Sequence, residues 1–267
     1  MIPAPGQWLY PYTGEAAAHA AVMARAARAP VVLLGERHDR ADHHRWQMQV
    51  AAGLLAHRAD MVLGFEMFPA RLDPVLADWV AGRLTEAAFL ERAEWGRVWG
   101  FAAGLYAPLF HFCRLHRVEM CGLNCRRDLV RAVGAGGWEA VPEAASEGIT
   151  PAAPASAAYR RYLFGVTGGA RPDRAAQAPE DPAFDRFVRA QQTWDRAFAC
   201  RIAALRARAA PPLVVGIIGR GHLECRGGTP AQLADLGIPD ALVLLPQDDA
   251  RPVASGLADA VFGLDPA

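Results

Sequence analysis

The chain has 267 residues and a mass of 28.7 kDa, and its 28 basic residues balance 28 acidic ones, so the formal net charge is zero. A neutral chain offers no basic field for a nucleic-acid backbone, and we expect no nucleic-acid partner. All the basic residues are arginine, and the lack of lysine excludes Schiff-base chemistry and a P-loop lysine.

Short apolar runs alternate with helical patterns along the chain. In chain order we predict a strand at 30–34, a helix at 43–57 capped by Asp42, a strand at 61–65, a helix at 102–116, a strand at 118–123, a helix at 182–208, and strands at 213–218 and 241–245. The runs are apolar on both faces, which is typical of interior strands of a parallel sheet. The alternation predicts one α/β domain over residues 1–267, with a mostly parallel sheet of about five strands flanked by helices.

Residues 134–181 interrupt this pattern with many alanines, prolines and glycines. We interpret them as a partly helical insertion that can move, rather than as a second domain. The stretch Tyr159–Phe164 is the part of the insertion that we expect to be ordered.

Polar side chains follow four of the predicted strands at the point where each strand ends. Glu36 and His38 follow the first strand, Glu66 the second, Asn124 the third and His222 the fourth. The carboxyl ends of parallel strands meet at one edge of a sheet, where sites form in open α/β folds. A carboxylate placed after a wholly apolar strand is costly unless it is paired. We therefore predict that Glu36, His38, Glu66 and His222 converge in one pocket.

Further polar residues accompany this predicted pocket. Arg37 and Arg220 are available partners for its carboxylates, and His43 either faces the pocket or makes a structural hydrogen bond. His44 is expected to be exposed. Gln191 lies on the apolar stripe of the long helix, so we expect it to be buried and to support a histidine of the pocket.

Several of these residues stand in motifs that resemble those of the ChaN-like haem-binding family. The resemblance covers residues 30–245 and rests on LGERHD at 34–39 with His43, His44 and Gln47, on GFEMF at 64–68, on Ala190-Gln191 with Trp194-Asp195, and on GRGH at 219–222 with GTP at 228–230. That family belongs to a superfamily with the erythromycin esterases and the Tiki-type metalloproteases. The resemblance implies a haem-binding protein of haem or iron uptake, with haem held at a homodimer surface and often with export and a lipid anchor.

A haem-binding function needs an axial ligand for iron and cations for the propionates. The segment Tyr159, Arg160, Arg161 and Tyr162 offers both, although an ordinary amphipathic helix explains the same pattern. The alternative iron ligands are His38, His43 and His44.

A hydrolase is the second hypothesis, with Glu36, His38, Glu66 and His222 as the catalytic group. Without a metal, a histidine could activate water while a glutamate holds its tautomer. With a divalent metal, two histidines and one or two glutamates would suit zinc or manganese. The sequence has neither an HExxH helix nor a GxSxG elbow, which excludes standard zincins and serine hydrolases.

Cysteine usage and apolar runs bear on the compartment. The five cysteines form no CxxC pair, so we expect no disulfide framework, and no apolar run is long enough for a transmembrane segment. The start shows neither a leader pattern nor a lipidation cysteine, so we expect a cytoplasmic location from this sequence. A periplasmic or membrane-anchored location would need a leader that is missing here.

Overall fold

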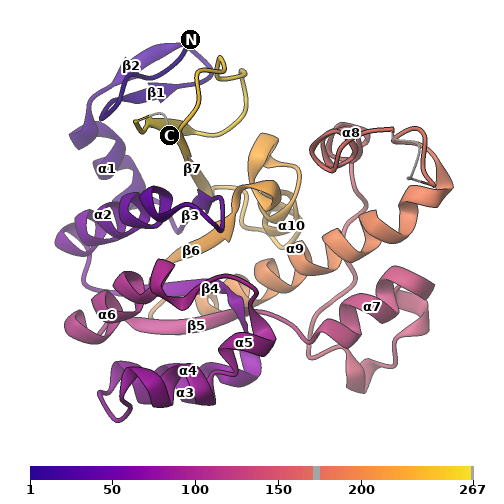
Figure 1. Ribbon diagram of the computed structural model, residues 1–267, viewed down its shortest axis with the longest axis horizontal. Coiled ribbons are helices and arrows are strands. Elements are labelled where there is room, and N and C mark those ends of the chain that lie inside the picture. The colour runs from indigo at the N-terminus through magenta and orange to yellow at the C-terminus, as the bar shows by residue number, and fades with distance from the viewer. Residues whose placement is uncertain (171–174, 266–267) are drawn as a thin grey trace.

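A single eight-stranded sheet forms the centre of the computed structural model, which describes residues 1–170 and 175–265 (Figure 1). The strand order is β2-β1-β8-β7-β3-β6-β4-β5. The six strands from β8 to β5 in this order run parallel, whereas β1 pairs antiparallel with both β8 and β2. The strands are β1 Trp8–Tyr10, β2 Glu15–Ala17, β3 Val31–Glu36, β4 Met61–Pro69, β5 Glu119–Asn124, β6 Leu213–Gly219, β7 Leu242–Gln247 and β8 Ala260–Gly263.

The five predicted strands correspond to β3, β4, β5, β6 and β7, so the α/β class with a mostly parallel sheet is confirmed. The strand count was too low, because β1, β2 and β8 have only three or four residues and give little periodic signal. The prediction that all five strands are interior was wrong for β5, which forms an edge of the sheet.

Ten α-helices lie in the described part of the chain, joined in places by short 3₁₀ turns. They are α1 His19–Arg28, α2 Ala41–His57, α3 Asp73–Val80, α4 Glu86–Arg92, α5 Trp95–Val98, α6 Ala107–His116, α7 Arg127–Gly136, α8 Ala157–Val166, α9 Asp185–Arg206 and α10 Thr229–Asp235. Helix α2 begins two residues earlier than predicted, so Asp42 lies in its first turn and Arg40 takes the N-cap position. The predicted helix at 102–116 is a 3₁₀ turn at Ala103–Leu105 followed by α6.

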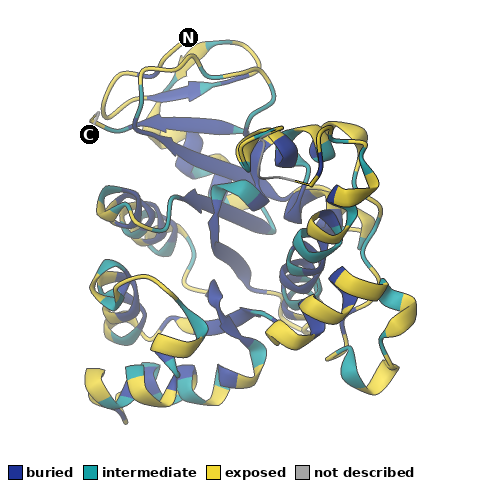
Figure 2. Cartoon of the chain, turned by 45° about the vertical axis from the view of Figure 1, so that its right-hand side comes forward, coloured by how far each residue is buried: buried dark blue, intermediate teal, exposed yellow. Residues whose placement is uncertain are grey.

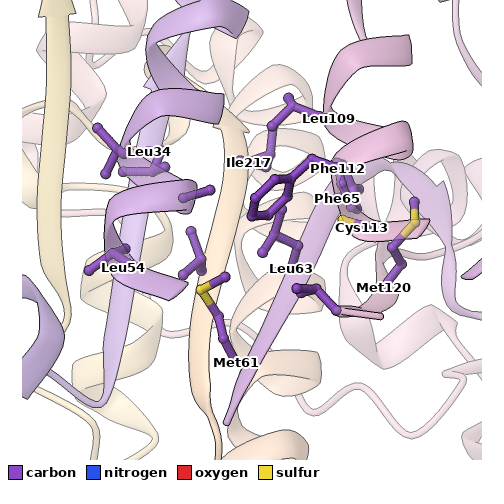
Figure 3. Packing of buried hydrophobic residues seen from close by; sticks show 14 of the residues in the cluster. Leu34, Leu54, Met61, Leu63, Phe65, Leu109, Phe112, Cys113, Met120 and Ile217 are labelled. Atoms are coloured by element: carbon purple, nitrogen blue, oxygen red, sulfur yellow. The ribbon is translucent and has the colours of Figure 1, made fainter. Parts of the chain in front are cut away.

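Side chains alternate between the two faces of the sheet and bury two separate cores. In β3, Val32 and Leu34 join the core under α1, α2 and α6. Val31 and Leu33 join the core under α7, α9 and α10. Figure 2 shows the buried strands between helices whose outer sides are exposed, and Figure 3 shows the packing of Leu34, Leu63 and Phe65 in the first core.

Residues 134–181 hold the end of α7, two 3₁₀ turns and α8, and α8 packs on a small core of its own. Residues 171–174 of the predicted insertion lie outside the described residues, and its movement stays a prediction. Within the described part of the chain, no helix combines the length and the apolarity that a membrane span requires.

Candidate functional site

Three neighbouring strands end at the same place and carry the predicted pocket residues. Glu36 is the last residue of β3, and Glu66 follows Phe65, where β4 stops pairing with β6. His222 lies in the 3₁₀ turn Arg220–His222 directly after β6. Because β6 lies between β3 and β4, these side chains converge as the sequence predicted.

The first histidine–carboxylate pair joins β3 to the loop after it. Glu36 is 1% exposed, and its Oε1 accepts a hydrogen bond of 2.7 Å from His38 Nδ1. The hydroxyl of Tyr106 donates to the same oxygen at 3.0 Å, and His44 Nδ1 lies 3.0 Å from Oε2. These contacts satisfy a fully buried carboxylate and leave His38 Nε2 free to face outward.

The second pair joins the turn after β6 to helix α9. His222 Nδ1 donates to Asp195 Oδ1 at 2.8 Å. Asp195 is completely buried, and it also accepts from the hydroxyls of Tyr159 at 2.7 Å and Thr229 at 3.0 Å. The side-chain amide of Gln191 lies 3.0 Å from His222 Nδ1. This pair has the same form as the first, with Nδ1 held and Nε2 turned away.

Glu66 lies between the two pairs. Its Oε1 is 3.9 Å from His38 Nε2 and 3.6 Å from His222 Nε2. Its Oε2 accepts a hydrogen bond of 2.5 Å from the backbone N–H of Gly219. One carboxylate is therefore fixed by the backbone of β6 and faces two imidazoles.

The carboxylates favour the protonated form of both imidazoles. Burial lowers the pKa of His38, but its hydrogen bond to Glu36 and the charge of Glu66 outweigh burial, so the pKa is raised above its usual value. Burial also lowers the pKa of His222, and the charges of Asp195 and Glu66 likewise raise it overall. Perturbed titrations of this kind, beside a cavity, are typical of functional sites.

A cavity of about 860 Å³ opens onto His38, Glu66 and His222. Its wall combines three aromatic rings with several guanidinium groups, so it can take a ligand that is partly flat and apolar and partly anionic. The residues concerned are Trp99, Phe101, Trp194, Arg71, Arg97, Arg126, Arg127 and Arg131.

The residues predicted as secondary members of the pocket are paired elsewhere. Arg37 and Arg220 line a smaller cavity of about 410 Å³ on the other side of the histidines. Arg37 pairs with Asp248 at 3.2 Å, and Arg220 pairs with Glu224. His43 is buried, and its Nδ1 accepts from the backbone N–H of Arg37 at 3.0 Å, which is the structural hydrogen bond that the sequence left open.

The structure gives the segment Tyr159–Tyr162 a structural role. Tyr159 donates to Asp195, and Tyr162 donates to Glu224 at 2.6 Å. Burial raises the pKa of both phenols, which disfavours the phenolate that iron would need. Arg160 pairs with Asp185 at 2.6 Å, and Arg161 is exposed. The segment therefore does not present its tyrosines as iron ligands.

Sequence reasoning missed several contributors to the site. The expectation that His44 is exposed was wrong, because α2 turns it inward onto Glu36. Asp195 and Tyr106 were not assigned a role. Asp195 stands four residues after Gln191, and this helical spacing on one face was the available signal. The predicted support of a histidine by Gln191 is confirmed, although Gln191 is only half-buried.

Among the residues that the structure describes, Asp42, His43 and Asp248 form the group whose potential metal-ligand atoms all lie within 4.8 Å of one another. Arg40 pairs with Asp42 at 2.5 Å and with Asp248 at 3.2 Å, and Arg37 also pairs with Asp248. These guanidinium groups neutralise the carboxylates and would repel a divalent cation, so we interpret the group as an ion-pair network.

Two histidine–carboxylate pairs that face a third carboxylate at the edge of a parallel sheet define an α/β protein with an acid–base site open to a cavity. The sequence matches the family described as haem-binding uptake, Tiki superfamily, ChaN over residues 22–233, and the chain belongs to this family. The family resemblance predicted from the motifs is thereby confirmed.

Solved structures show the same fold. ChaN of Campylobacter jejuni, a structure of cofacial haem binding, matches with a TM-score of 0.72 and 17% identity, covering 96% of this chain and 95% of that one. The type III effector HopBA1 matches at 0.52 with 14% identity over 92% of each chain. A mutant of the erythromycin esterase EreC matches at 0.50 with 14% identity, over 90% of this chain and 76% of that one. A comparison with curated proteins found no match.

Proposed function

We propose that this protein binds haem in the 860 Å³ cavity. The observation that carries the proposal is the donor set of the cavity, in a chain that belongs to the haem-binding family. Haem offers an iron that takes imidazole, a flat apolar ring and two propionates, and the cavity offers imidazole Nε2 atoms, aromatic rings and arginines.

His38 is the iron ligand that we propose. Its side chain is 28% exposed, compared with 11% for His222, and Glu36 holds its Nδ1 so that Nε2 faces outward. Metal-ligating histidines commonly donate their other ring N–H to a carboxylate in this way. The rings of Trp99 and Phe101 lie 4.8 and 5.1 Å from the His38 ring and supply apolar surface beside it.

Hemin added to the purified protein should shift the Soret band in a saturable way at micromolar concentration. We expect His38→Ala to weaken binding at least about tenfold and to change the Soret position, because iron loses its axial ligand. His116→Ala, at the end of α6, is the matched control and should leave the spectrum unchanged. A His38→Ala spectrum identical to that of the wild type would contradict the ligand assignment. The homodimer implied by the resemblance stays a prediction, and sedimentation of the hemin-loaded protein would measure it.

A hydrolase is the second candidate function, and a specific observation favours it. His38 Nε2 and His222 Nε2 both face Glu66 Oε1, at 3.9 and 3.6 Å, and the cavity gives a substrate access to all three groups. In this arrangement a neutral imidazole takes a proton from water, and the protonated imidazole opposite gives one to the leaving group. The charge of Glu66 stabilises each imidazolium as it forms. If a divalent metal takes part, the same Nε2 and Oε1 atoms are the ligands that we propose for it.

The hydrolase proposal predicts a pH-dependent rate that Asp195→Asn should alter. A base must be neutral, so the raised pKa of His222 places the rise of activity above its usual value of 6.5. Removing the Asp195 charge lowers that pKa, so the rise should move to lower pH while kcat falls about 10²-fold or more. The rate on 4-nitrophenyl acetate, with and without Mn²⁺ or Zn²⁺, measures both effects.

Asp185→Asn, on the same helix, is the control for this measurement and should leave the pH profile unchanged. Hydrolysis no faster in the wild type than in Asp195→Asn at every pH would count against a hydrolase.

A further inference from the structure

A second groove continues from the cavity between helices α7 and α9. Its volume is about 380 Å³, and it shares Arg127, Arg131 and Trp194 with the large cavity. Its apolar part is formed by Val130, Gly134, Ala190 and the ring of Trp194. A single ligand can therefore extend from the histidines into this groove.

The helices pack closely at the inner end of the groove. A Cβ added at Gly134 would lie 3.3 Å from the backbone oxygen of Arg186 and 3.5 Å from Ala190 Cβ. Arg189 also donates to the backbone oxygen of Gly134 at 2.8 Å, which ties α9 to α7. The groove is thus bounded by two helices fixed to each other, a preformed shape of the kind that ligand sites use.

Three arginines line this groove, and their charges are not balanced by acidic side chains. Arg127 donates to the backbone oxygen of Val98 at 2.9 Å, and Arg131 donates to that of Arg127 at 3.3 Å. Across the described residues, no carboxylate forms an ion pair with Arg127, Arg131 or Arg186, although most arginines near the cavity have one. All three side chains are exposed, so they can turn toward a ligand.

The start of α7 adds to the positive potential. The helix has ten residues and begins at Arg127, and its N-cap, Arg126, makes no side-chain hydrogen bond that caps it. Residues 124–128 line the cavity, so the positive end of the helix dipole is at its wall. Guanidinium groups and a helix N-terminus together favour an oxyanion at this place.

We propose that the groove formed by Arg127, Arg131, Arg186 and Trp194 binds the carboxylates of a flat amphipathic ligand whose apolar body lies against Trp194. For the haem of the proposed function, on which this inference rests, these carboxylates are the two propionates. The unpaired guanidinium groups supply the charge complementarity, and the indole and the apolar floor supply the surface for the ring. The groove thereby sets which way round the ligand enters the cavity, with its acidic edge toward α7.

Hemin and hemin dimethyl ester separate this inference from the proposed function, because the ester keeps the iron and the ring but carries no propionate charge. We expect the wild type to bind hemin at least about tenfold more tightly than the ester. The double variant Arg127→Ala/Arg131→Ala should weaken hemin binding about tenfold and leave ester binding within about twofold. Arg127→Lys/Arg131→Lys should restore part of the loss, since it keeps the charge but not the bidentate geometry.

The matched control is Arg83→Ala/Arg92→Ala, which removes the same net charge from arginines that pair with Asp78. It should leave both affinities unchanged, and thermal midpoints of all variants should agree because every substituted side chain is on the surface. If the wild type binds hemin and its ester equally, or if the α7 variant weakens both equally, haem binding stands and this inference is overturned. If the wild type binds neither compound, both are overturned.

Discussion

Gly219→Ala should disrupt the site while leaving the fold in place. A Cβ on Gly219 would lie 2.7 Å from His38 Cε1 and 3.3 Å from Glu66 Oε2, closer to the imidazole than carbon atoms approach in proteins. The backbone at Gly219, with φ −56° and ψ 134°, suits alanine, so the conflict is with the site alone. We expect hemin binding to weaken at least about tenfold, at a stability cost of about 1–3 kcal/mol.

Gly221→Ala is the control for this prediction, because it lies two residues away in the same turn and an added Cβ would meet nothing within 4 Å. Isothermal titration of both variants with hemin, beside thermal unfolding, separates loss of the site from loss of the fold. If Gly219→Ala binds hemin as tightly as Gly221→Ala, His38 is not part of the haem site.

The convergence of the site was predictable because it follows from chain direction alone. Parallel strands deliver the residues after them to one edge, so the order of strands and loops along the chain is enough to place Glu36, Glu66 and His222 together. Local sequence also located the five longer strands, since each is a continuous apolar run. Neither argument depends on knowing how the helices pack.

The partners of the site residues depend on that packing, and sequence reasoning could not supply them. Tyr106 precedes α6, and His44 is in α2, yet both reach Glu36 across the end of the sheet. Tyr159 comes from the insertion and reaches Asp195, 36 positions away. No periodic pattern encodes contacts of this separation.

The insertion is joined to the site more closely than its composition suggests. A Cβ at Gly227 would overlap the Tyr159 ring, and one at Gly228 would lie 2.6 Å from its hydroxyl. Two successive glycines therefore leave the space in which Tyr159 reaches Asp195. Through Asp195, helix α8 fixes the orientation of His222, so docking of the insertion and geometry of the second pair are linked.

Glu36→Ala is expected to destabilise the protein more than any other single change at the site. Glu36 accepts from Tyr106 and His38 and contacts His44, and all of these contacts lose their acceptor at once. Removing one partner from a buried charged network costs about 3–5 kcal/mol, because the remaining polar groups stay buried without partners. Urea unfolding of the variant against wild type measures this difference. Glu15→Ala, an exposed carboxylate in β2, should change it by less than about 0.5 kcal/mol.

The size of this loss should depend on pH in a direction fixed by His38. Although burial lowers the pKa of His38, Glu36 and Glu66 raise it above 6.5 in the folded protein. A raised folded pKa means that the stabilisation is fully present below the unfolded value and is lost as the pH rises through the folded one. The variant lacks the Glu36 contribution, so its deficit in unfolding free energy should be larger at pH 6 than at pH 9. A deficit that grows with rising pH would show that Glu36 does not stabilise the protonated imidazole, and the first histidine–carboxylate pair would then need another explanation.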